Sequence, residues 1–246
     1  RPNGIGEKMK IKIATDNCNY DAHYLIKESA SAEIVLELEF EKIVSMQSQR
    51  QRQKDLIDLI HQELSKFQWI ISESVNIELC WYLDAVERQE TDKVGDLDNI
   101  TKPILDALTG AKGVLIDDAQ IGSIHTYWQS RNTLKVDNIL RIKLQFNNDY
   151  CFDKDSLYFI QYEGAVCTPM NLDLTCMKSI SSALQVIEAR KEQRLAAEKI
   201  KALGGNVDRM LVVSSYDIHR TRLNGFDNTR ILSAEKLRDK LVSAGV

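Results

Sequence analysis

Residues 95–108 read GDLDNITKPILDAL, and residues 115–121 read LIDDAQI. The first segment places Asp96 and Asp98 two residues apart, and Lys102 follows four residues after the second aspartate. In an extended segment, side chains two residues apart point to the same side, so both carboxylates are expected on one side of the chain. Clustered carboxylates repel one another unless a cation neutralises them. Oxygen ligands of this kind favour Mg²⁺ or Mn²⁺.

An amphipathic helix is expected to follow, beginning near Asn99 and burying Ile104, Leu105 and Leu108. Pro103 is expected in its first turn, where a missing N–H is tolerated. Asp106 lies four residues after Lys102. Its simplest role is therefore an ion pair with that lysine on the helix surface.

Taken alone, each acidic pair would be a turn or a helix cap. A calcium loop is disfavoured because the twelfth position counted from Asp96 is Ala107 and not glutamate. The two acidic pairs, the lysine and the helix between them favour a functional site over two unrelated turns.

The joint pattern resembles the RusA-type Holliday junction resolvases. The pieces that match in order and approximate spacing are DLDN at 96–99, Lys102, LDAL at 105–108 and DDAQI at 117–121. The resemblance covers about residues 30–149, and the rest of the chain has no recognised counterpart. It implies a mixed α/β fold with a small sheet and packed helices. It also implies a homodimer that incises four-way DNA junctions with the help of a metal ion.

The resemblance assigns the metal site to Asp96, Asp98 and Asp118, with Mg²⁺ as cofactor and Mn²⁺ as its substitute. Lys102 matches the family's essential lysine and completes the catalytic set. Neighbouring side chains in extended chain point to opposite faces, so only one of Asp117 and Asp118 is expected to join the site. The resemblance favours Asp118. Asp117 and Asp106 are then residues of a second tier.

Two other functions stay open. One is a binding module that holds branched DNA or a protein without cutting, although the intact acidic and lysine positions argue against it. The other is a metal nuclease that acts on flaps or RNA, which the sequence does not separate from junction cleavage.

The 246 residues carry a formal net charge of −4, which argues against a surface coated with basic residues. A local basic surface would suffice for a DNA enzyme, because net charge averages such a feature away. Cations are unfavourable at a helix N-terminus, so a basic helix start is of interest. The predicted helix at about 50–68 begins with candidate DNA-binding residues Arg50, Arg52 and Lys54.

The chain has five cysteines, an odd number that cannot all pair, and no two of them form a C-x-x-C motif. This indicates reduced thiols in a cytoplasmic protein. No apolar run approaches the roughly 20 residues that a membrane helix needs, so no membrane is expected as a partner.

Residues 1–149 are expected to form a first, RusA-like domain, and their hydrophobic periodicity predicts its strands and helices. Its other predicted elements are strands at 34–40 and 75–83 and a hairpin formed by residues 121–128 and 134–146.

A turn at 147–149 closes that domain, and residues 150–246 are expected to form a C-terminal α/β extension of unknown role. Its predicted elements are a strand-like segment at 157–167, a long helix at 177–203, a short strand at 210–213 and a last helix capped by Ser233.

Overall fold

The structure is a computed structural model, and it describes residues 9–40, 43–45, 48, 50–85, 96–130, 137–207, 217–223 and 225–243. The chain divides into two compact units, Arg1–Cys151 and Phe152–Val246. The division falls two residues beyond the predicted boundary. Each unit is described by itself.

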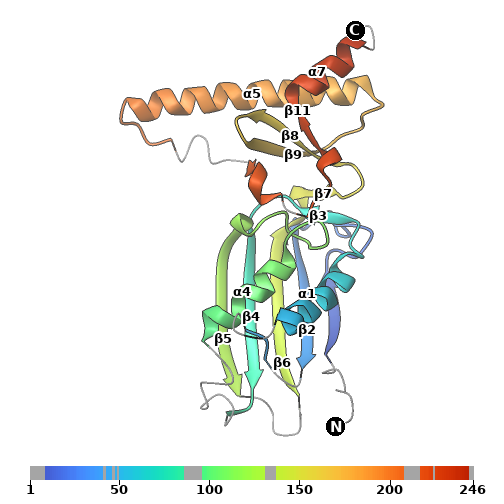
Figure 1. The fold of residues 1–246 in the computed structure, drawn as a ribbon, viewed down its shortest axis with the longest axis vertical. Coiled ribbons are helices and arrows are strands. Elements are labelled where there is room, and N and C mark those ends of the chain that lie inside the picture. The colour runs from blue at the N-terminus through green and yellow to red at the C-terminus, as the bar shows by residue number, and fades with distance from the viewer. Residues whose placement is uncertain are drawn as a thin grey trace. The chain divides into compact units, whose positions relative to one another are not determined.

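The first unit is built on a five-stranded sheet in the order β1-β2-β6-β4-β5 (Figure 1). Neighbouring strands are antiparallel except β4 and β5, which are parallel. The sheet is therefore mixed, and the predicted α/β class is confirmed. Its strands are β1 (Lys10–Asp16), β2 (Ser31–Phe40), β4 (Val75–Leu83), β5 (Ile121–Ser130) and β6 (Asn138–Asn147).

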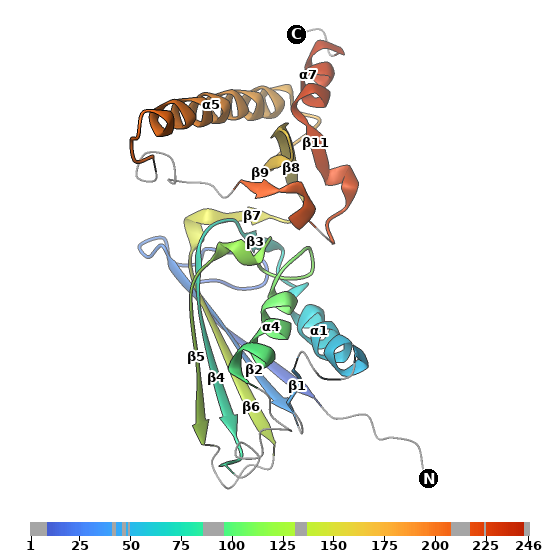
Figure 2. The same ribbon diagram turned by 60° about the vertical axis from the view of Figure 1, so that its left-hand side comes forward.

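Helices α1 (Arg50–Leu64) and α4 (Leu97–Leu108) cover one face of this sheet (Figure 2). In β2, every second residue from Ala32 to Phe40 is apolar and buried, and these residues form one core cluster with apolar residues of α1 and α4. The residues between them are three glutamates and Val35. The core that results includes Ile34, Leu36, Leu38, Leu56, Ile60, Trp81, Ile104, Leu140 and Ile142.

Strands β5 and β6 are both present, but the predicted hairpin between them is wrong. β4 lies between them, parallel to β5 and antiparallel to β6. Parallel neighbours need a crossover connection, and α4 supplies it between β4 and β5. The helix that carries the lysine is thus the crossover of a β-α-β unit.

Strand β3 (Trp69–Ile71) also belongs to this unit. It pairs with β7 (Cys151–Asp153), a short strand that begins at the last residue of the unit. The short helices η1 (Asp118–Gln120) and η2 (Asn148–Tyr150) precede β5 and β7.

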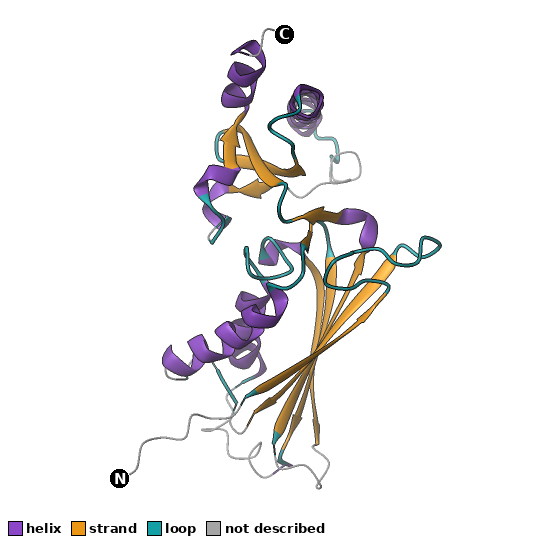
Figure 3. Ribbon diagram, turned by 90° about the vertical axis from the view of Figure 1, so that its right-hand side faces the viewer, coloured by secondary structure: helices purple, strands orange, loops and turns teal. Residues whose placement is uncertain are grey.

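The second unit contains a four-stranded sheet in the order β10-β9-β8-β11, and its described residues also form the helices α5 and α7 (Figure 3). The predicted single strand at 157–167 is wrong, because the chain turns at Gly164 (φ 52°) and forms a hairpin. The long helix and the last helix are confirmed, and Ser233 Oγ accepts from Lys236 N at 3.2 Å. The strand predicted at 210–213 lies outside the described residues. The elements are β8 (Leu157–Glu163), β9 (Val166–Asn171), α5 (Met177–Ala202), β10 (Ile218–His219), η3 (Arg220–Arg222), η4 (Asn228–Arg230), β11 (Ile231–Ser233) and α7 (Ala234–Ser243).

Candidate active site

Helix α4 begins at Leu97, so the two aspartates of the first motif differ in backbone conformation. Asp96 is the extended N-cap residue (φ −81°, ψ 157°), whereas Asp98 lies in the first helical turn. The prediction that both lie in an extended segment is therefore wrong. A carboxylate in the first turn is favoured by the helix dipole, which helps the helix start before Asn99. Both side chains are exposed.

Pro103 lies inside α4 and not in its first turn, where it was predicted. The proline has no N–H to donate to the carbonyl of Asn99, four residues earlier. The burial of Ile100, Ile104 and Leu108 against the core keeps the helix in place.

Lys102 joins the two halves of the motif. Its Nζ lies 2.7 Å from Asp106 Oδ1 on the same helix and 3.4 Å from Asp118 Oδ2, sixteen residues further along the chain. The three side chains are 43–45% exposed. The hydrogen bond with Asp106, helped by the charges of Asp106 and Asp118, raises the pKa of Lys102. Lys102 is therefore held as a cation between two carboxylates.

The turn after α4 brings Asp118 back to this lysine. Gly110 has a φ of 86°, which favours glycine. A Cβ on Gly113 would lie 2.1 Å from the carbonyl oxygen of Leu108, so the turn closes only with glycine there. The apolar residues 114–116 that follow are buried, and Val114 O accepts from Ile71 N of β3 at 2.9 Å.

Asp117 and Asp118 have different surroundings. Asp117 is buried and caps η1, and its carboxylate accepts from Ala119 N at 2.9 Å. Asp118, half-buried, contacts Lys102. The carboxylate of Asp117 therefore caps a short helix, whereas the carboxylate of Asp118 contacts the lysine of α4.

Gln120 is a structural residue that the sequence reasoning passed over. It is fully buried, and its Oε1 accepts from Ile116 N at 2.7 Å and from Asp117 N at 3.0 Å. Its Nε2 donates to the carbonyls of Ile71 (2.8 Å) and Glu73 (3.2 Å). Gln120 thus fastens the segment that carries Asp118 to the end of β3. Its position inside the DDAQI motif is the sequence feature that could have pointed to this role.

Among the described residues, no three histidine, cysteine or acidic side chains are close enough to share a metal ion. Asp98 nevertheless precedes Lys102 by one helical turn, so the side chains of these two residues are neighbours on α4. The proposed ligands offer only carboxylate oxygens, which suits Mg²⁺. The donor chemistry therefore suits the ion, whereas the described side chains of Asp96, Asp98 and Asp118 are not close enough together to share it.

The predicted DNA-binding residues occupy the start of α1, which packs beside α4. Arg50 and Lys54 are exposed, and Arg52 is half-buried. Their role stays a prediction.

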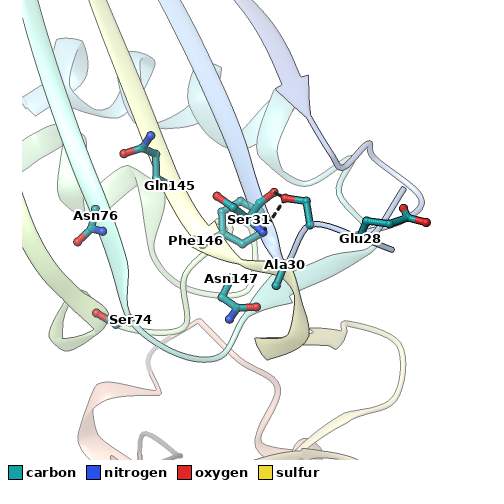
Figure 4. A pocket seen from close by; sticks show the side chains of 9 residues that line it. Glu28, Ala30, Ser31, Ser74, Asn76, Gln145, Phe146 and Asn147 are labelled. Carbon is teal, nitrogen blue, oxygen red and sulfur yellow. Dashed lines mark hydrogen bonds between the residues drawn. The ribbon is translucent and has the colours of Figure 1, made fainter. Parts of the chain in front are cut away.

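A hollow of about 730 Å³ opens elsewhere in the first unit, at the end of the sheet face that the helices leave uncovered (Figure 4). Hydroxyl and carboxamide groups with one carboxylate line it, and no cation is among its lining residues. Because it lacks both cations and the aspartate cluster, we assign it no part in phosphate chemistry. Its polar lining includes Glu28, Ser31, Ser74, Asn76, Gln145 and Asn147.

Residues 33–143 match the family model described as Endodeoxyribonuclease RusA. This part of the chain is similar to the RusA family of endodeoxyribonucleases. The match runs from β2 into β6, so it includes α4, η1 and both acidic pairs. The fold and the enzyme class therefore agree with the resemblance seen in the sequence, and the first unit carries a nuclease domain. A search of curated proteins found no match. No helix in the described part of the chain has the length and apolarity to span a membrane.

Proposed function

We propose that the RusA domain is a metal-dependent endonuclease that cuts branched DNA, with four-way junctions as its substrate. The observation that carries this proposal is the contact between Lys102 and Asp118. It joins a cation and a carboxylate from the two separate motif segments, within the residues that match the nuclease family. A site of this composition suits phosphodiester chemistry, which needs both a metal-binding oxygen set and a group that neutralises phosphate charge.

Asp96, Asp98 and Asp118 would hold Mg²⁺, with Mn²⁺ as its substitute. The bound ion would lower the pKa of a water molecule and stabilise charge on the scissile phosphate. Lys102 Nζ lies 3.4 Å from Asp118 Oδ2 and offsets its negative charge. With substrate bound, its ammonium group positions the phosphate and stabilises the developing negative charge. Asp106 orients Lys102 on the surface of α4, because its Oδ1 lies 2.7 Å from Lys102 Nζ.

The acting form is proposed to be a homodimer, because symmetric incision of a junction needs two active sites and a two-fold dimer supplies them. Strand β5 is suited to such an interface. It forms an outer edge of the sheet in the described residues, and its ten residues include no proline, lysine, arginine or acid. Natural edges usually carry such residues to prevent pairing.

We place the protein in the cytoplasm. All five cysteines are unpaired thiols, which fits a reducing compartment.

The test is a panel of end-labelled substrates incubated with the full chain and Mg²⁺: a four-way junction, a flap, a linear duplex, a single strand and an RNA duplex. Selective cutting of the junction supports the proposal. Preferred cutting of flaps or RNA would show that the substrate is not the four-way junction. Binding to the junction without any cutting in Mg²⁺ or Mn²⁺ would leave a binding module and overturn the enzyme.

A further inference from the structure

Helix α5 is longer than the sheet it packs on. Its buried side chains are Ile180, Ala183 and Ile187, which follow one stripe with helical spacing. No residue of α5 beyond Ile187 is buried. The fifteen residues that remain extend about 22 Å at 1.5 Å per residue. In Figure 1 this end of the helix projects past the strands of its own sheet.

The same stripe continues along the projecting half, but its chemistry changes. At 3.6 residues per turn, the positions in line with the buried side chains are occupied mainly by cations. Glu198 is the one acidic residue on this line. We call the four cations the cationic stripe: Arg190, Lys191, Arg194 and Lys201.

The cationic stripe is incompletely neutralised. Arg194 Nε lies 3.8 Å from Glu198 and 3.9 Å from Glu163, and Lys191 Nζ lies 3.9 Å from Glu188. These separations are longer than hydrogen bonds. Arg190 and Lys201 form no ion pair with any residue that the structure describes. The stripe therefore retains cations that are available to an anionic partner.

The two units also differ in charge. Residues 1–151 carry 18 lysines and arginines against 24 acidic residues, whereas residues 152–246 carry 14 against 12. A polyanion is repelled on average by the first unit, so its attraction must come from local groups of cations.

We propose that the cationic stripe contacts the phosphate backbone of the DNA substrate. The inference rests on the proposed function, since it assumes that the chain acts on DNA, and it assigns to the second unit a part of that binding. Arginine and lysine contacts to phosphates fix position without reading sequence, which suits a substrate recognised by its branched shape. The replacement of an apolar stripe by cations, where the helix leaves its sheet, is the feature that this contact explains.

The test measures binding of the full chain to a labelled four-way junction in EDTA, over a range of salt concentrations. The variants are Arg190→Glu and Lys201→Glu. The matched controls are Lys178→Glu and Lys199→Glu, which make the same charge change on other sides of α5. All four positions lie on the surface of one helix, and circular dichroism verifies that each variant is folded.

Each stripe variant is expected to weaken binding several-fold and to lower the slope of log Kd against log salt by about one. The controls should change binding much less. Equal effects from stripe and control variants would show that net charge alone matters and would overturn the stripe. Wild-type affinity in both stripe variants, with junction cutting intact, would overturn the stripe and leave the proposed function standing. A wild-type chain that neither binds nor cuts DNA would overturn both proposals.

Discussion

Asp117 and Asp118 are adjacent, yet one carboxylate caps a short helix and the other contacts Lys102. We expect Asp118→Asn to abolish cleavage while keeping or improving junction binding, because it removes a negative charge beside the phosphate. Asp117→Asn should keep most of the activity, since an asparagine side chain also caps helices. Parallel cleavage and gel-shift assays compare them. An inactive Asp117→Asn beside an active Asp118→Asn would reverse the assignment.

Lys102 is nearly half exposed, and its ion pairs are with the partly exposed carboxylates of Asp106 and Asp118. Lys102→Ala should therefore reduce cleavage by at least tenfold while the melting temperature stays within about 2 °C, because exposed ion pairs contribute about 0.5 kcal/mol. Lys112→Ala is the control, since Lys112 is an exposed lysine in the turn after α4. A large drop in melting temperature with Lys102→Ala would make its role structural.

At this scale the sequence predicted the Lys102–Asp106 pair, because both residues lie on one helix with a spacing of four. It misplaced Asp98, because the start of a helix depends on whether Asp96 or a later residue becomes the N-cap. The contact with Asp118 depends on how the turn at 109–116 folds back, and local periodicity carries no such information.

The segment that holds Asp118 depends on Gln120. Gln120→Ala should lower the free energy of unfolding by about 3 kcal/mol, because it leaves buried backbone groups without partners. Cleavage should fall further than stability explains, since Asp118 loses its support. Gln62→Ala, at an exposed position near the end of α1, serves as the control and should change neither. Denaturant unfolding and cleavage rates measure both effects, and unchanged stability in Gln120→Ala would contradict the role.

At the scale of elements, strands β2, β4 and β6 were predictable because one face of each is apolar and the other polar. The strand that pairs with β5 was not predictable from the sequence. Two strands that are close in sequence favour a hairpin. In the structure, however, β5 pairs with β4, to which the α4 crossover connects it. Strand pairing is a tertiary property, so alternation alone predicts a strand and not its neighbours.

Each unit has its own hydrophobic core. We therefore expect the chain truncated after Cys151 to fold cooperatively and to retain metal-dependent cutting. Its affinity for junctions should be weaker than that of the full chain, because the cationic stripe is absent. Thermal unfolding and salt-dependent binding test this, and an insoluble or unfolded fragment would mean that the two units stabilise each other.

We propose that Asp96, Asp98, Asp118 and Lys102 form a metal-dependent site that cuts junctions. The most direct measurement maps the ends produced from a labelled four-way junction by wild-type protein and by Asp98→Asn, each in Mg²⁺ and in excess EDTA. We expect the wild-type protein to make paired cuts on opposed strands in Mg²⁺, and we expect no cuts in EDTA or by Asp98→Asn. Equal cutting in EDTA, or by Asp98→Asn, would contradict this proposal.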